Sequence, residues 1–200
     1  FLDHPKAESA LIAEDRHMID AMTARGVCSS AHVIRSSPSL SGCKVVNDGG
    51  EIDLGELTVK FIEARGHAPG NILVHIPLHN AVLVSDSLGN YYPGRGFFPT
   101  FFTGYDDYMQ TIDRLEKLNP MMMGIAHNGC ILDRDAIKRM FGLARQAAND
   151  VKQFIINDTR SDEEVAQDLF RFYYTDALTI YSTQNILNCC RLLVRRVKEI

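Results

Sequence analysis

The stretch Gly66-His67-Ala68-Pro69-Gly70-Asn71 follows an alternating apolar run, and the fold can be inferred outward from it. Two later segments share its form: Ser85-Asp86-Ser87-Leu88-Gly89 and Ala126-His127-Asn128-Gly129. In each segment, an apolar run typical of a strand gives way to a glycine-containing turn that carries a His or an Asp. Ligands placed where strands become loops gather at one rim of a sheet. The three segments therefore predict a site built from His67, Asp86 and His127.

These residue types indicate metal chemistry. Imidazole and carboxylate groups suit Zn, Fe and Mn. Two such ions held about 3.5–4 Å apart generate hydroxide and stabilise the charge that develops on a leaving oxygen. Asp86 is the least replaceable of the three, because a carboxylate has two oxygens and can span both ions. An imidazole cannot do so without losing the proton on its other nitrogen.

The three motifs resemble the last three ligand stations of the metallo-β-lactamase superfamily, and the resemblance covers roughly residues 5 to 130. Members carry H-x-H-x-D-H, then a His in a G-H-[TSA]-x-G turn, a bridging Asp and a last His. The resemblance implies an α/β fold, the αβ/βα four-layer sandwich, with two divalent metal ions, Zn or Fe, as cofactors. It implies that His67 ligates the first metal, that His127 ligates the second, and that Asp86 bridges both and serves in catalysis. Ala126-His127-Asn128-Gly129 departs from the P-G-H-G form of many relatives.

The first ligand station has no counterpart in this sequence. No H-x-H-x-D-H occurs, and Asp3-His4 lacks a preceding His at the required spacing. Residues 1–13 resemble the approach to the strand that follows this motif, so we expect a chain that begins just after it and lacks the N-terminal part of the sandwich. The alternative is a natural half-protein that has lost these ligands.

Hydrophobic periodicity divides the chain into two predicted parts, a partial sandwich over 1–132 and a helical cap or extension over 133–200. In the first part it predicts a strand over 7–13, helices over 14–25 and 105–118, and strands that lead into each motif. In the second part, Ser161-Asp162-Glu163-Glu164 is a capping box that opens a helix through Tyr174. The C-terminal helices resemble those of quinolone-signal-response and glyoxalase II-type thioesterases. They are expected to form a lid, to shape an acyl or aromatic pocket, or to build a homodimer.

An aromatic segment lies between Asp86 and the next helix. Residues 88–102 are broken by glycine and proline yet rich in Tyr and Phe. A loop this apolar beside a metal site is typical of a substrate wall, for which the candidates are Tyr91, Tyr92, Phe98 and Phe102. Equally open is the interpretation that these rings cap the core or a dimer interface.

Composition restricts the partners. The chain has 200 residues, of which 46% are hydrophobic, and a net charge of −4, which argues against a nucleic-acid surface. No apolar run reaches membrane-spanning length. The five cysteines lack zinc-finger spacing, so we expect reduced thiols and a cytoplasmic protein. The basic cluster Arg191, Arg195, Arg196 and Lys198 is interpreted as a solvated helix face.

The predicted function is a metal-dependent hydrolase acting on a small molecule, with an ester or thioester as first choice and phosphodiester or lactone hydrolysis left open. A di-iron oxidoreductase of flavodiiron type is one alternative, because Ser85-Asp86-Ser87-Leu88-Gly89 also resembles the S-D-A-F-G stretch of those proteins. A regulator or binding module that kept the fold and lost part of the metal site is another.

Overall fold

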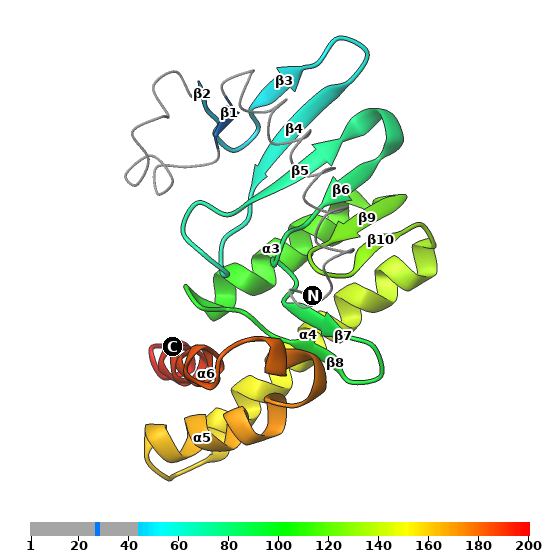
Figure 1. Ribbon diagram of the computed structural model, residues 1–200. Coiled ribbons are helices and arrows are strands. Elements are labelled where there is room, and N and C mark those ends of the chain that lie inside the picture. The colour runs from blue at the N-terminus through cyan, green and yellow to red at the C-terminus, as the bar shows by residue number, and fades with distance from the viewer. Residues whose placement is uncertain (1–26, 29–43) are drawn as a thin grey trace. The chain divides into compact units, whose positions relative to one another are not determined.

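The computed structural model describes residues 27–28 and 44–200, and the chain divides into two compact units, Phe1–Asn47 and Asp48–Ile200. In the first unit, β1 (Val27–Cys28) pairs in parallel with β2 (Lys44–Val45). The strand predicted over 7–13 and the helix predicted over 14–25 lie outside the described residues. All elements below belong to the second unit (Figure 1).

A six-stranded sheet forms the centre of this unit. Its strands lie in the order β10-β9-β6-β5-β4-β3 and are antiparallel except for the parallel β6–β9 pair. Their bounds are β3 (Glu51–Asp53), β4 (Thr58–Glu63), β5 (Ile72–Ile76), β6 (Ala81–Leu83), β9 (Met122–Ile125) and β10 (Gly129–Ile131). The strands predicted before each of the three motifs are confirmed, and the turn between β5 and β6 holds the short 3-10 helix η1 (Pro77–His79).

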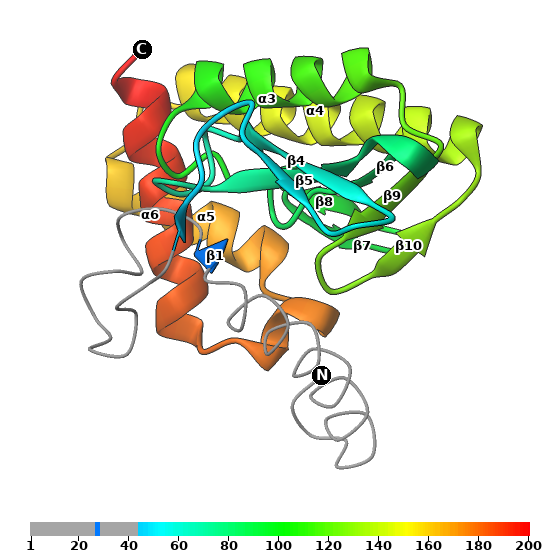
Figure 2. The ribbon, with the colours of Figure 1, turned by 90° about the horizontal axis from the view of Figure 1, so that it is seen from above.

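Helices α3 (Tyr105–Leu118) and α4 (Arg134–Asn157) lie side by side over one face of this sheet (Figure 2). Strand residues on the face that they cover are fully buried, as Leu73, Val82 and Met123 show. Because side chains alternate along a strand, Leu83 and Met122 belong to the other face, where they are 38% and 37% exposed. The predicted mixed α/β architecture is confirmed. Within the described residues of this unit it comprises one six-stranded sheet with its covering helices and the two-stranded sheet of β7 (Asn90–Tyr92) and β8 (Gly96–Phe98).

The C-terminal part is helical as predicted. It contains α5 (Asp162–Tyr173), the 3-10 helix η2 (Asp176–Ile180) and α6 (Thr183–Lys198). Ser161 caps α5 by accepting from Glu164 N, while the Glu164 carboxylate accepts from Ser161 N at 3.0 Å, so the predicted capping box is confirmed. Apolar residues at helical spacing form a stripe on α4 and another on α6. Both stripes face the core and bury Ile137, Phe141, Ala144, Ile186, Cys190 and Leu193, among others.

The aromatic segment differs from the predicted loop. It contains an antiparallel hairpin of β7 (Asn90–Tyr92) and β8 (Gly96–Phe98), which pairs Asn90 with Phe98. Its glycine-broken sequence suits a tight hairpin, because Gly94 and Gly96 adopt positive φ angles of 81° and 90°. Phe97 and Phe98 are buried at the end of the hairpin, and their packing against the core fixes the position of the two short strands. Among the described residues, no helix is both long and apolar enough to cross a membrane.

Candidate metal centre

His67 lies in the turn that follows β4, and the preceding glycine determines how close this turn comes to α3. Gly66 has φ +108°, and a Cβ built on it would lie 2.4 Å from the Cα atom of Tyr108. Only glycine permits this approach. The turn is held further by Thr111 Oγ1, which donates to the Arg65 carbonyl at 2.8 Å, and by Thr103 N, which donates to the Gly66 carbonyl at 2.9 Å.

Asp86 lies just beyond β6, where the chain leaves the sheet in a tight turn. Ser85 adopts a left-handed conformation with φ 50°. The Asp86 carbonyl accepts from Gly89 N at 2.9 Å and from the Thr100 hydroxyl at 2.9 Å. These two hydrogen bonds fix the backbone that carries the carboxylate at the edge of the sheet.

His127 occupies the turn between β9 and β10. It is also left-handed, with φ 67°, and its neighbour Asn128 holds the turn by donating from Nδ2 to the Tyr91 carbonyl at 3.1 Å. Because β6 and β9 are parallel neighbours, their carboxyl ends meet at one edge of the sheet. This topology brings His127 to Asp86.

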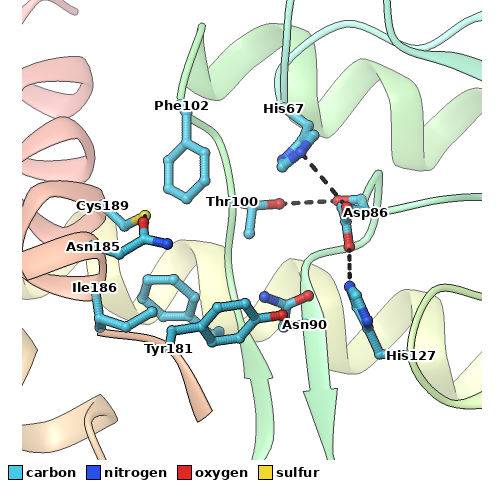
Figure 3. Close-up of a pocket in the computed structure, with 11 residues that line it drawn as sticks. His67, Asp86, Asn90, Thr100, Phe102, His127, Tyr181, Asn185, Ile186 and Cys189 are labelled. Carbon is cyan, nitrogen blue, oxygen red and sulfur yellow. Dashed lines mark hydrogen bonds and ion pairs between the residues drawn. The ribbon is translucent and has the colours of Figure 1, made fainter. Parts of the chain in front are cut away.

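The three predicted residues come together around the carboxylate (Figure 3). His67 Nε2 lies 3.8 Å from Asp86 Oδ2, and His127 Nε2 lies 3.4 Å from Asp86 Oδ1. Each imidazole therefore faces a different oxygen, which is the arrangement that a bridging carboxylate requires. The side chains of His67 and Asp86 are 21% and 27% exposed, against 52% for His127, so the site opens to solvent on the His127 side.

Burial lowers the pKa of His67, while the Asp86 carboxylate and the nearby Thr100 backbone oppose this shift in part. A lowered pKa favours the neutral imidazole, which is the form that binds metal ions. His67 Nδ1 and Asp86 Oδ1 are buried and lack a hydrogen-bond partner among the described residues. Such atoms are uncommon in folded proteins, where another protein group, a water molecule or a bound ion normally satisfies them.

The distances between the imidazole nitrogens and the carboxylate oxygens can be compared with the distances between such atoms around a bound metal ion. An ion about 2.1 Å from an imidazole nitrogen and a carboxylate oxygen holds those atoms about 3.0–3.4 Å apart at bond angles of about 90–110°. The His127–Asp86 separation of 3.4 Å lies within this range, and the His67–Asp86 separation of 3.8 Å lies slightly beyond it. In the part of the chain that the structure describes, no group of three or more His, Cys, Asp or Glu side chains is placed to hold one ion. The three side chains carry the nitrogen and oxygen atoms that metal ions bind, and the two imidazoles lie on either side of the Asp86 carboxylate. Two ions need more ligands than these three.

The predicted aromatic candidates separate into two pairs. Phe98 and Phe102 line the cavity of about 170 Å³ that contains His67, Asp86 and His127. The Phe102 ring lies 5.6 Å from that of His67. Tyr92 lines a neighbouring cavity of about 310 Å³, and Tyr91 packs against Phe97 with ring centroids 5.1 Å apart. The structure thus places Phe98 and Phe102 beside the three candidate ligands and Tyr91 and Tyr92 outside their cavity.

The same cavity contains residues that the sequence did not single out. One group lines the cavity from the C-terminal region: Asn185, Ile186 and Cys189 on α6, and Tyr181 just before this helix. The other group comprises Asn90 on the hairpin and Thr100 just after it. Burial raises the pKa of the Tyr181 hydroxyl, as does the negative charge of Asp86. The only signal in the sequence was the apolar stripe of α6, which predicts a packed helix face without saying what that face meets.

The basic cluster on α6 is largely paired with carboxylates. Arg191 Nη2 contacts Glu163 at 2.6 Å and Lys198 pairs with Asp162, so both tie α6 to α5. Arg196 is more enclosed, with a side chain 27% exposed, and its Nε donates at 2.8 Å to the carbonyl of Phe102. This bond attaches α6 to the segment that forms one cavity wall.

Fold and site together define a mixed α/β protein with a His–Asp–His cluster at the edge of its sheet. Residues 10–127 match the family model described as the metallo-beta-lactamase superfamily. The match covers more than half of the chain, and the protein belongs to this superfamily. Among curated proteins, none matches this chain.

Solved structures agree on the fold. A beta-lactamase domain protein from Burkholderia ambifaria is 13% identical with a TM-score of 0.57, over 86% of this chain and 52% of that one. A metallo-beta-lactamase family protein from Thermus thermophilus is 14% identical with a TM-score of 0.53, over 94% and 62%. A stereoselective inverting sec-alkylsulfatase from Pseudomonas sp. is 15% identical with a TM-score of 0.53, over 78% and 27%. The chain thus spans less than two thirds of each of these proteins, and the superfamily includes hydrolases, of which the alkylsulfatase is one.

Proposed function

We propose that this protein is a metal-dependent hydrolase of a small ester or thioester, in which His67, Asp86 and His127 provide part of the ligand set of two Zn or Fe ions. The observation that carries the proposal is the position of the Asp86 carboxylate between two imidazoles, each facing a different oxygen. When bound, such ions supply a hydroxide nucleophile and stabilise charge on the scissile oxygen.

The chain's own residues support this chemistry in three ways. Burial lowers the pKa of His67 and so favours the neutral imidazole, which has a nitrogen lone pair for an ion. Phe98, Phe102 and Ile186 form an apolar wall that excludes water from one side of the cavity. The Tyr181 hydroxyl stays protonated at neutral pH, so it is able to donate a hydrogen bond to a substrate oxygen.

The size of the cavity, which Ile186 of α6 helps to line, favours a small organic substrate. A cavity of about 170 Å³ lies below the usual range of about 300–1,000 Å³ for drug-sized ligands. We infer that the group bound next to the carboxylate is compact and that the C-terminal helices shape its pocket.

Elemental mass spectrometry on the purified, unchelated protein tests the proposal, because metal content requires no guess about substrate. We expect roughly two ions per chain, and loss of both bound metal and ester hydrolysis in Asp86→Ala. His79→Ala is the matched control, since His79 is exposed on η1 and does not line the cavity. Retained metal and turnover in Asp86→Ala would show that the bridging role is wrongly assigned.

A binding module is the second candidate, because three donors are few for two ions. Essentially no metal in the wild-type protein would favour this candidate over the hydrolase. Bound iron with oxygen- or peroxide-dependent turnover would instead favour a di-iron oxidoreductase.

A further inference from the structure

Asn90 presents a buried hydrogen-bond acceptor to which none of the described residues donates. Among the described residues, three buried side-chain polar atoms lack a hydrogen-bond partner: His67 Nδ1, Asp86 Oδ1 and Asn90 Oδ1. All three residues line the same cavity. The first two belong to the candidate metal ligands, whereas Asn90 is an amide with no part in that set.

The position of Asn90 is fixed by its backbone. Asn90 is the first residue of β7, where it pairs with Phe98 across the hairpin. The next residue, Tyr91, accepts a hydrogen bond from Asn128 at 3.1 Å, which ties the strand to the His127 turn. The backbone that carries Asn90 is therefore tied to the other strand of the hairpin and to the His127 turn.

The amide oxygen is buried in a cavity that polar and apolar side chains line together. Figure 3 shows Asn90 between the Asp86–His127 pair and the Tyr181 ring, with Ile186 and Phe102 farther along the cavity. An unpaired amide oxygen in such surroundings is unfavourable, because it has lost its hydrogen bonds to water and gained none in return. A ligand group that donates to it regains that interaction, and a ligand without a donor does not.

We propose that Asn90 is a specificity determinant: its Oδ1 accepts a hydrogen bond from an O–H or N–H group of the ligand, so the cavity selects compact, largely apolar molecules that carry one donor. The proposal rests on the proposed function in taking this cavity as the substrate site. It adds the chemical class of the group bound there and the residue that recognises it.

Two ring compounds of equal heavy-atom count test this selection. Cyclohexanol carries a hydroxyl donor, whereas cyclohexanone carries only an acceptor. Binding to the full chain is read from the protection of Cys189, which lines the cavity, against methyl methanethiosulfonate, with modification of each cysteine located by tandem mass spectrometry. Cys130 is exposed and outside the cavity, so its reaction rate is the internal control.

We expect cyclohexanol to protect Cys189 at a concentration at least about fivefold lower than cyclohexanone, as one hydrogen bond to a buried acceptor implies. In Asn90→Leu, which replaces the amide by an apolar group of similar size, the two compounds should protect equally. Asn188→Leu is the matched control. Its amide lies on the same helix as Cys189 but is exposed and outside the cavity, where it contacts Gln184 and Arg191, and the preference should survive there.

Equal protection by both compounds in the wild-type protein, or a preference for cyclohexanone, would overturn the proposal without any need for the variant. A preference unchanged in Asn90→Leu would assign the recognition to another residue and overturn it as well. The outcome is separable from the hydrolase proposal. Donor preference without bound metal would leave Asn90 as proposed and remove the hydrolase, and bound metal without donor preference would do the reverse.

Discussion

Replacing Gly66 by alanine should destabilise the protein through two separable effects. The residue has φ +108°, a conformation that L-residues rarely adopt. The space around it is also full, since a new Cβ would lie 2.4 Å from Tyr108 Cα and 2.5 Å from Tyr108 N. These are backbone atoms of α3, so the clash cannot be relieved by turning a flexible side chain.

The magnitude follows from adding the two effects. Backbone strain at an unfavourable φ costs about 1–3 kcal/mol. Forcing an extra methyl group into a packed contact adds about 1–3 kcal/mol. A substitution at Gly55 allows the two effects to be measured separately, because Gly55 has a similar φ of +100° and no atom within 4 Å of a built Cβ. Gly55→Ala should therefore carry the strain alone, and Gly66→Ala should cost at least about 1 kcal/mol more.

Urea unfolding followed by circular dichroism measures both differences, provided that the slopes of the transitions agree between variants. We expect the free energy of unfolding to fall in the order wild type, Gly55→Ala, Gly66→Ala. Equal costs for the two substitutions would show that α3 moves away freely. The close approach of the His67 turn to this helix would then not be what positions the histidine.

Two further predictions concern buried groups. Tyr108→Phe should lower the free energy of unfolding by about 1–3 kcal/mol, because the fully buried hydroxyl donates at 2.6 Å to the Leu88 carbonyl; an unchanged urea midpoint would contradict this. Burial raises the pKa of the Cys190 thiol to about 12, so in the native protein alkylation should proceed in the order Cys130, Cys189, Cys190, and equal rates by tandem mass spectrometry would refute it.

Local signals in the sequence were sufficient for most elements of the second unit. The helix predicted over 105–118 has those bounds in the structure, because its apolar positions recur at helical spacing and Asp106 and Asp107 begin it. The three motifs were also predictable. Each lies directly after a strand whose pattern is visible in sequence, and the sheet order then brings His67, Asp86 and His127 to one edge.

What sequence reasoning missed depends on contacts between distant segments. The hairpin β7–β8 is short and rich in glycine, and its strands are fixed by the burial of Phe97 and Phe98 rather than by alternation. The contribution of α6 to the cavity was likewise hidden. Ile186 belongs to a stripe that reads as core, and nothing in its spacing shows that the first turn of this helix faces Asp86. The unsatisfied Asn90 oxygen exists only once these segments meet.

Backbone strain gives the same location for the site by an independent route. Among the described residues, four that are not glycine have positive φ: Asn80, Ser85, Asn119 and His127. Asn80 and Asn119 end helices, where a left-handed asparagine is ordinary, so their conformation needs no functional explanation. Ser85 and His127 have no such role, and one adjoins Asp86 while the other is a candidate ligand itself.

Strained residues persist where surrounding contacts over-determine them, and here those contacts are visible. The hydroxyl of Thr100 holds the Asp86 carbonyl at 2.9 Å, and Asn128 holds the His127 turn against β7 at 3.1 Å. These hydrogen bonds hold the candidate metal ligands Asp86 and His127 in positions where their side chains make few stabilising interactions unless a ligand is bound. A fold that maintains strained turns and orphaned polar atoms in one cavity loses stability unless a bound group restores it. Because the strained residues are Ser85, which adjoins Asp86, and His127 rather than residues of the α3–α4 core, backbone strain supports a ligand site at this edge of the sheet without reference to any motif.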